Sequence, residues 1–281
     1  MKIHLAKSAG FCFGVKRALD IARETAASGE PVYMLGDIVH NEEAVRQIEK
    51  RGIKKIKRLG NGRNKILLIR AHGAPARIFR QARKYGYRIV DATCPKVRQI
   101  HKIAKDMEKK GYRIIVIGDK KHNEVHGISG QLKNKAIVID SPRRIGFKKI
   151  LKLKKVAALV QSTQDLEMAV AIAARLKAKI KEFKFFNTVC LPTRIKQAEI
   201  KIMPRLNQAM IIIGSKTSAN TKRLYQISRA LNKNTHWIQS SRDLKKDWFK
   251  GLDTLDTVGI TAGASTPEST INKVVTAISY L

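Results

Sequence analysis

A pattern occurs three times along the chain, and each copy carries one of its three cysteines. Cys12 lies in AGFCFGV, Cys94 in DATCPKV and Cys190 in NTVCLPT. In every copy a glycine that ends an apolar run follows 24 residues after the cysteine (12 to 36, 94 to 118, 190 to 214). The cysteines are 82 and then 96 residues apart. An internal repeat of this length predicts three small domains and excludes a solenoid of short units.

Short, mostly apolar segments such as 32–35, 66–69 and 210–213 alternate with amphipathic segments along the chain. This alternation predicts an α/β protein with mainly parallel sheets that are covered on both faces. The repeat predicts the domains 14–95, 96–191, and 192–281 together with 1–13. In this division Cys12, near the N-terminus, belongs to the third domain. Each of the three domains then contains one cysteine, as a pseudo-threefold arrangement requires.

Polar side chains of the repeat fall at the predicted strand ends, where functional groups of parallel sheets collect. Aligned on the glycine, the copies read GDIVHNEE, GDKKHNEV and GSKTSANT, so that His40, His122 and Ser218 occupy one position. A second set lies in RAHGAP, VQSTQ and TAGASTP and comprises His72, Ser162, Thr163 and Ser265. Threefold symmetry would bring the thiols to one axis and surround them with imidazoles, hydroxyls and the amide of Asn220.

Three cysteines without a fourth favour a metal centre with one open coordination position. Structural zinc normally takes four ligands at close spacing, and a cubane iron-sulfur cluster also normally takes four thiolates. With three thiolates, one iron of a cluster stays open to a substrate oxygen. Unrelated buried cysteines are the alternative, and the shared offset argues against them.

The net charge of +35, from 57 Lys and Arg against 22 Asp and Glu, raises the alternative of a nucleic-acid-binding protein whose cysteines are structural or hold zinc. We expect no nucleic-acid partner, because the lysines are spread along the chain without a zinc-finger, RNA-recognition or helix-turn-helix pattern. A basic surface equally suits an anionic substrate or an acidic protein partner.

No segment approaches the uninterrupted run of about 20 apolar residues that a membrane helix needs. The first seven residues, MKIHLAK, lack the apolar core of a signal peptide. We therefore expect a cytoplasmic protein without a membrane partner, in which the thiols stay reduced.

Isolated histidines such as His101 are interpreted as surface or core residues. The repeat-equivalent histidines instead favour an anion site, because imidazoles and helix N-termini together suit a phosphate. Glu124 follows His122 by two residues, and a carboxylate in an anion site is useful if it supplies a proton. The alternative role of Glu124 is structural: its negative charge would compensate the positive end of a helix dipole.

Taken together, AGFCFGV, GDIVHN, RAHG, DATCP, KHNEVHG, QST, NTVC, GSK-x-SxN and TAGAST resemble the 4-hydroxy-3-methylbut-2-enyl diphosphate reductase family, from about residue 1 to residue 280. This family catalyses the last step of the non-mevalonate isoprenoid pathway. The resemblance implies a trefoil of three α/β domains around a 4Fe-4S cluster, one per chain, held by Cys12, Cys94 and Cys190. It also implies reduction of an allylic alcohol diphosphate, whose hydroxyl binds the open iron, to isopentenyl and dimethylallyl diphosphates.

The resemblance further assigns roles to single residues, with Glu124 as the proton donor and Ser162 and Thr163 as hydroxyls beside it. The positions that match the diphosphate-binding set are His40, His72, His122, Ser218, Asn220 and Ser265. Ala219 stands where the family commonly has serine and offers only its backbone amide, Ser162 replaces threonine, and Pro192 and Lys196 replace alanine and arginine. No Gly-x-Gly-x-x-Gly is present, so we expect electrons from a ferredoxin or flavodoxin.

Overall fold

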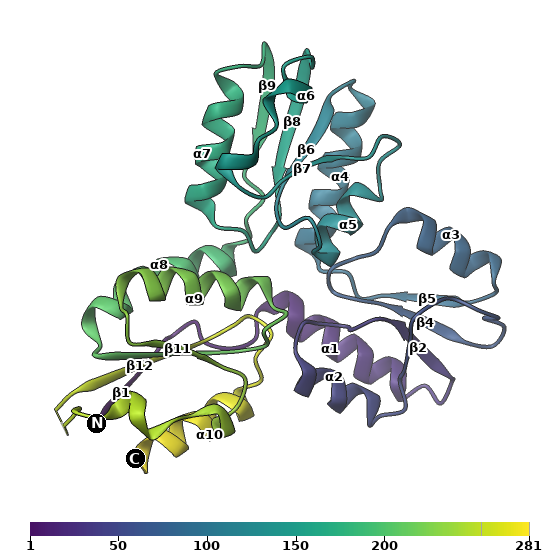
Figure 1. The fold of residues 1–281 in the computed structure, drawn as a ribbon. Helices are drawn as coiled ribbons and strands as arrows, with labels where there is room; N and C mark the ends of the chain where they lie inside the picture. Colours follow the sequence, from purple (N-terminus) through teal and green to yellow (C-terminus); the bar gives the residue numbers. More distant parts are fainter. Residues whose placement is uncertain (254, 281) are drawn as a thin grey trace. The chain divides into compact units, whose positions relative to one another are not determined.

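The structure is a computed structural model that describes residues 1–253 and 255–280. It contains three four-stranded sheets in which every strand pairing is parallel (Figure 1). In sheet order, the strands are β3 (Lys54–Ile56), β2 (Val32–Leu35), β4 (Ile66–Ile69) and β5 (Arg88–Asp91) in the first sheet; β7 (Ile137–Ile139), β6 (Arg113–Ile117), β8 (Lys155–Val160) and β9 (Glu182–Phe186) in the second; and β11 (Thr235–Ile238), β10 (Ala209–Ile213), β12 (Thr257–Ala262) and β1 (Lys2–Leu5) in the third. The predicted α/β class with parallel sheets is confirmed.

The three sheets share one strand order, and in each the last strand of that order leads to a cysteine. The N-terminal strand β1 is this fourth strand in the third sheet, so the chain's two ends contribute to one sheet. A helix begins directly after each cysteine. The helices are α1 (Phe13–Ala26), α2 (Glu42–Glu49), α3 (Ala76–Lys84), α4 (Pro95–Lys109), α5 (Asn123–Ser129), α6 (Phe147–Ile150), α7 (Leu166–Lys177), α8 (Leu191–Leu206), α9 (Ala219–Leu231) and α10 (Glu268–Ser279). Within the described part of the chain, none of them combines the length and apolar character that crossing a membrane requires.

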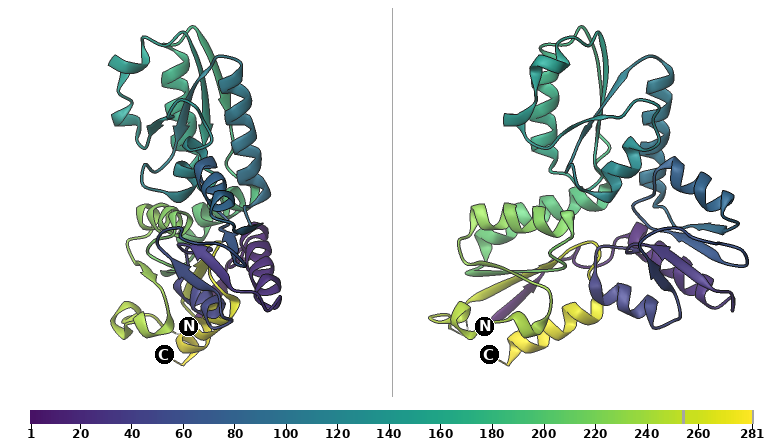
Figure 2. Two further views of the ribbon diagram at one scale, coloured as in Figure 1. Left: turned by 90° about the vertical axis from the view of Figure 1, so that its right-hand side faces the viewer. Right: turned by 45° about the vertical axis from the view of Figure 1, so that its right-hand side comes forward.

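Both faces of the second sheet are buried, because alternate residues of its strands enter different cores. On one side Ile115 packs with Ile172 of α7. On the other side Ile114 and Leu159 pack with Ala104 of α4. Helices α7 and α4 accordingly flank this sheet on opposite sides (Figures 1 and 2). This double coverage explains why its strands are apolar without alternation.

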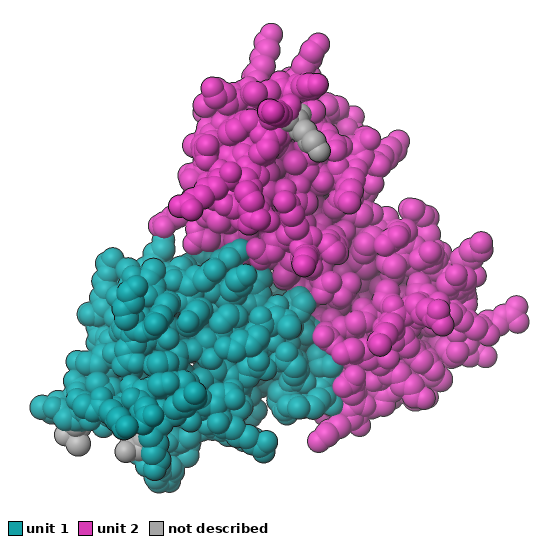
Figure 3. Space-filling view, in the orientation of Figure 1, with its two compact units in different colours: residues 1–16, 39–47, 191–281 teal, residues 17–38, 48–190 magenta. Residues whose placement is uncertain are grey.

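The chain divides into two compact units (Figure 3). Unit 1 comprises residues 1–16, 39–47 and 191–281, and unit 2 comprises residues 17–38 and 48–190. The third sheet lies in unit 1 and the first two sheets lie in unit 2. The division into three domains at the boundaries given above stays a prediction.

Two strands differ from the sequence-based expectation. The sequence predicts a first strand over residues 2–8, but β1 ends at Leu5. The backbone N–H groups of Lys7 and Ser8 donate to the Glu199 carboxylate of α8, at 2.6 and 3.1 Å, and not to a neighbouring strand. Strand β3 was not predicted. It is a three-residue edge strand, Lys54-Lys55-Ile56, and its two lysines carry no strand signal.

Gly130 ends α5 in a right-handed conformation that alanine also adopts, so Gly130→Ala tests packing alone. An added Cβ would meet the Pro75 ring and lie 2.9 Å from Pro75 Cα. We expect this overlap to destabilise the protein by about 1–3 kcal/mol, measured as a lowered midpoint of thermal unfolding. Gly60→Ala is the control, because nothing lies within 4 Å of its added Cβ. Equal midpoints for the two variants would contradict the close packing of Gly130 on Pro75.

Candidate functional site

Each cysteine lies in a turn that a backbone hydrogen bond ties to the loop after another strand of its own sheet. The three equivalent bonds run from Cys94 N–H to Ala71 O (2.9 Å), from Cys190 N–H to Ser162 O (3.0 Å) and from Cys12 N–H to Ala264 O (3.1 Å). The acceptors belong to the second set of predicted loops, RAHGAP, VQSTQ and TAGASTP. The repeat is thus present in the backbone hydrogen bonds as well as in the sequence.

The thiols of Cys12, Cys94 and Cys190 are half-buried, and none of the three forms a disulfide. Cys94 is the N-cap residue of α4, and α1 and α8 begin at the residues after Cys12 and Cys190. A thiol at such a position is a suitable ligand for a metal ion or an iron-sulfur cluster.

Glu124 in unit 2 is a buried carboxylate with 1% of its surface exposed. Its Oε1 accepts a hydrogen bond from the Ser162 N–H at 2.6 Å, and its Oε2 accepts one from the Ser162 hydroxyl at 2.7 Å. Burial raises the pKa of the Glu124 carboxyl, and the two bonds from Ser162 oppose this shift. Near neutral pH, Glu124 is therefore better suited to hold a proton than an exposed glutamate is.

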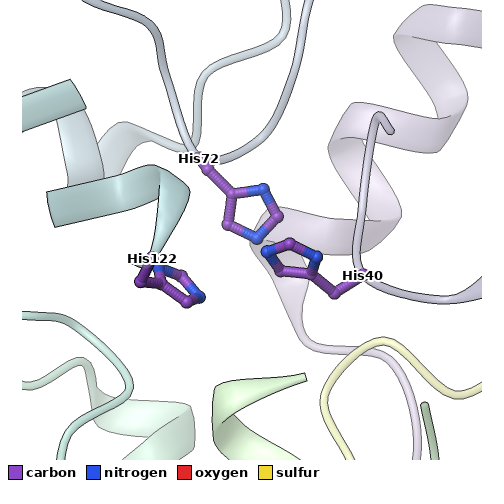
Figure 4. Close-up of side chains that lie close together, drawn as sticks. All are labelled: His40, His72 and His122. Carbon is purple, nitrogen blue, oxygen red and sulfur yellow. The ribbon is translucent and has the colours of Figure 1, made fainter. Parts of the chain in front are cut away.

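His122 begins α5 as its N-cap residue, and its Nδ1 accepts a hydrogen bond from the Glu124 N–H at 3.2 Å. In a neutral imidazole whose Nδ1 accepts, the proton lies on Nε2. The ring of His72 lies edge-on to that of His122, with centroids 5.5 Å apart (Figure 4). His40, drawn in the same view, belongs to unit 1.

Thr163 lies beside Ser162 and accepts a hydrogen bond from Gln161 Nε2 at 3.0 Å.

Unit 1 holds the remaining predicted residues. The Ser265 hydroxyl donates to the His40 carbonyl at 2.8 Å and so joins two loops that are 225 positions apart. Ser218 is the N-cap residue of α9 and accepts from Thr221 N–H, and Ala219 begins that helix. Both polar atoms of the Asn220 amide are buried without a hydrogen-bond partner among the described residues. Buried amides are normally satisfied, so Asn220 is suited to a ligand.

From the sequence, Lys196 is interpreted only as a replacement of the family's arginine. In the structure it also makes buried contacts that hold a turn in place. It is buried in unit 1, and its ammonium donates to the carbonyls of Ser8 and Ala262, the latter at 3.2 Å. Burial lowers the pKa of Lys196 to about 8, against the opposing effect of a Cys12 thiolate. Together with Glu199, it fastens the segment before Cys12 to α8. Lys196 and Glu199 are three positions apart and thus share a helix face, which was the only signal available in the sequence.

His101 of α4 was expected to be a surface or core residue, and it is buried between a loop and helix α5 of unit 2. An added Cβ on Gly73 would lie 2.8 Å from His101 Cε1, and one on Gly127 would lie 3.4 Å from its Nε2. Burial lowers the pKa of His101 to about 4. The neutral ring therefore supports the loop that carries His72 and the helix that carries Glu124.

A family model described as LytB protein matches residues 3–279. The chain belongs to the LytB family. It is 37% identical to a protein of Aquifex aeolicus (strain VF5), over 97% of this chain and 94% of that protein. It is 36% identical to a protein of Geobacter metallireducens, over 98% and 96%. Both relatives are named 4-hydroxy-3-methylbut-2-enyl diphosphate reductase, which confirms the resemblance read from the motifs.

Solved structures of the LytB family agree with this assignment. A structure of the reductase from Plasmodium falciparum aligns with a TM-score of 0.89 at 27% identity, over 99% of this chain and 88% of that one. Another, described as the terminal enzyme of the non-mevalonate pathway, aligns with a TM-score of 0.72 at 37% identity, over 100% and 99%. Membership of the LytB family is consistent with a metal cofactor. The roles of single residues, and the meeting of the two units' residues at one site, stay predictions.

The hydrogen bond from the Ser162 hydroxyl partly offsets the rise that burial causes in the pKa of Glu124. Ser162→Ala removes this hydrogen bond, so we expect the Glu124 carboxyl to stay protonated to a higher pH. The infrared band of the protonated carboxyl, followed against pH and assigned by its loss in Glu124→Gln, measures the shift. Ser162→Thr retains a hydroxyl and is the control. An unchanged titration in Ser162→Ala would show that the hydroxyl does not act on Glu124.

Because the folded-state pKa of Glu124 is raised, the stability that it contributes is present at low pH and is lost as the pH rises through that pKa. Glu124→Gln carries no such titration. We therefore expect the variant to lose less stability than the wild type between acidic and alkaline pH, measured by thermal unfolding across that range.

Proposed function

We propose that this LytB-family chain is a reductase that converts (E)-4-hydroxy-3-methylbut-2-enyl diphosphate into isopentenyl and dimethylallyl diphosphates. The reaction breaks the allylic C–O bond, consumes two electrons and two protons, and releases water. The observation that carries the proposal is Glu124, a buried acid with a raised pKa whose two oxygens are held by Ser162. The names of the relatives support the same activity.

A 4Fe-4S cluster, one per chain, would be held by Cys12, Cys94 and Cys190. Their thiols at three helix starts, with equivalent backbone tethers, supply suitable ligands. When bound, the cluster would supply electrons and a Lewis-acidic iron for the substrate hydroxyl. Lys196 and Glu199 would hold the Cys12 turn in place, because they fix the carbonyl and amide groups of the segment before it.

The diphosphate would bind to imidazole and amide groups. His122 would contribute its imidazole, Asn220 offers its buried amide, and the N–H groups at the start of α9 offer further donors at Ala219. His40, His72, Ser218 and Ser265 complete the proposed set. Binding of this remote group would hold the carbon skeleton in position for the reaction.

Glu124 would supply the proton that lets the hydroxyl leave as water. Its carboxyl is shielded from bulk water, and the Ser162 hydroxyl fixes its orientation. Thr163, the next residue along the chain, would contribute a second hydroxyl. A ferredoxin or flavodoxin would bring the electrons, and the net charge of +35 suits such acidic carriers. A cytoplasmic location would suit this cluster, because cysteines stay reduced there and remain able to bind it.

Glu124→Gln preserves size and hydrogen bonding and removes the acid. We expect kcat to fall by about 100-fold to 10,000-fold, the usual contribution of a general acid, with substrate affinity and iron content nearly unchanged. Steady-state kinetics with a chemical reductant, together with iron analysis, measure these quantities. A wild-type kcat with only a raised KM would make Glu124 a binding residue.

Single Cys→Ser variants at positions 12, 94 and 190 test the cluster. After anaerobic reconstitution we expect each to lose iron and the visible absorption of the cluster, because a serine hydroxyl is a poor substitute for a thiolate. Ser265→Ala is the control and should retain both. Undiminished iron in any cysteine variant would remove that residue as a ligand, and a colourless wild type would reject the cluster altogether.

A further inference from the structure

A cavity away from the candidate catalytic residues lies in unit 2, with a volume of about 680 Å³. One wall comes from the ends of β2 and β4 and from α3, and the other comes from α5 and the residues after it. Its floor is apolar and its cationic groups come from both walls. The lining residues are Leu35, Leu68, Ile69, Arg70, Ala74, Pro75, Arg77, Ile78, Arg80, His126, Ser129, Gly130, Leu132 and Lys135.

The charges of this cavity have one sign. Arg70, Arg77, Arg80 and Lys135 line it, and no Asp or Glu is among its described lining residues. None of these four cationic side chains forms an ion pair with another described residue, whereas nearby Lys55 binds Asp37 at 2.7 Å. Unpaired cations around a concave surface attract an anion.

Arg70 is the innermost of these groups. It is half-buried, and an added Cβ on Gly36 would lie 3.2 Å from its Nη1, so its guanidinium lies against the backbone at the end of β2. Burial lowers the pKa of Arg70, against the opposing charge of Asp37. A guanidinium held in this way, without an ion pair to a described residue, has its donors available to a bound oxyanion.

The two walls are joined by direct contacts, so the cavity is preformed. Ala76 N–H donates to Gly130 O at 3.0 Å, and Gln131 Nε2 donates to Ala74 O at 2.8 Å. Gly130 packs on Pro75 without room for a side chain. A preformed cavity with an apolar floor and a few polar groups is typical of a small-molecule site.

We propose that this cavity, distinct from the candidate catalytic residues, binds a small organic phosphate with a short apolar tail. The phosphate contacts Arg70, with Arg77, Arg80 and Lys135 around it, and the tail lies on Leu68, Ile78 and Leu132. One wall continues from the loop of His72, and the other belongs to the helix of Glu124. A bound ligand therefore stabilises both supports of the candidate active site.

Hexyl phosphate, titrated into the full-length protein by calorimetry, tests the proposal. We expect Arg70→Met to weaken its binding by about 10- to 100-fold, as expected for loss of a charged hydrogen bond. The double variant Arg77→Gln/Arg80→Gln should also weaken binding, and added salt should weaken it in the wild type. Arg83→Gln lies on the same helix outside the cavity and is the charge-matched control, with affinity unchanged.

Inorganic phosphate should bind more weakly than hexyl phosphate, by about fourfold for each methylene that the cavity buries. Equal affinities for the two would overturn the proposed apolar subsite. Binding that is retained in the Arg77/Arg80 double variant and lost in Asn220→Ala would place the ligand at the candidate active site and overturn the proposal. Should Arg70→Met fail to fold, the double variant decides the outcome, because its side chains are exposed.

Discussion

The hydrogen bond from each cysteine's N–H to a loop at the end of another strand is the constraint on which the candidate site depends. It joins the turn before a helix to the loop that carries Ala71, Ser162 or Ala264. Each bond spans two strands of one parallel sheet, and parallel strands end at a common edge. A thiol, a helix N-terminus and a polar loop are thereby placed together in every copy of the repeat.

The same arrangement accounts for the different side chains in the three copies. The position of His122 in one copy is that of His40 in another and Ser218 in the third. Of the three copies, all within the described residues, the one with His122 has a buried carboxylate, Glu124. The equivalent Glu42 is exposed, although it also accepts a hydrogen bond from a serine hydroxyl, that of Ser215. One backbone scaffold can therefore present an acid in one copy and hydroxyl or amide donors in the others.

Cations in this chain fall into groups with different physical roles. Most lie on the surface, where the net charge favours acidic partners. Lys196 is buried and bound to carbonyls, where it holds a turn in place. Arg70 is half-buried beside an apolar floor and forms no ion pair with a described residue, so it can receive an anion. The net charge counts all of these cations equally, whereas their degree of burial distinguishes their roles.

The sequence by itself determined the class of fold and the equivalence of the three cysteine turns. Continuous apolar runs such as 66–69 predicted buried parallel strands, and the 24-residue offset marked Cys12, Cys94 and Cys190 as equivalent. Local pattern suffices for these features because strand burial and helix starts depend on neighbouring residues. The repeat also placed residues 1–13 with the last domain, but only the tertiary structure decided that β1 pairs with β12, that Ser162 binds Glu124, and that Lys196 and Glu199 hold the segment before Cys12. These contacts join residues between 38 and 255 positions apart, and their pairing depends on the packing of whole elements, which no local pattern encodes.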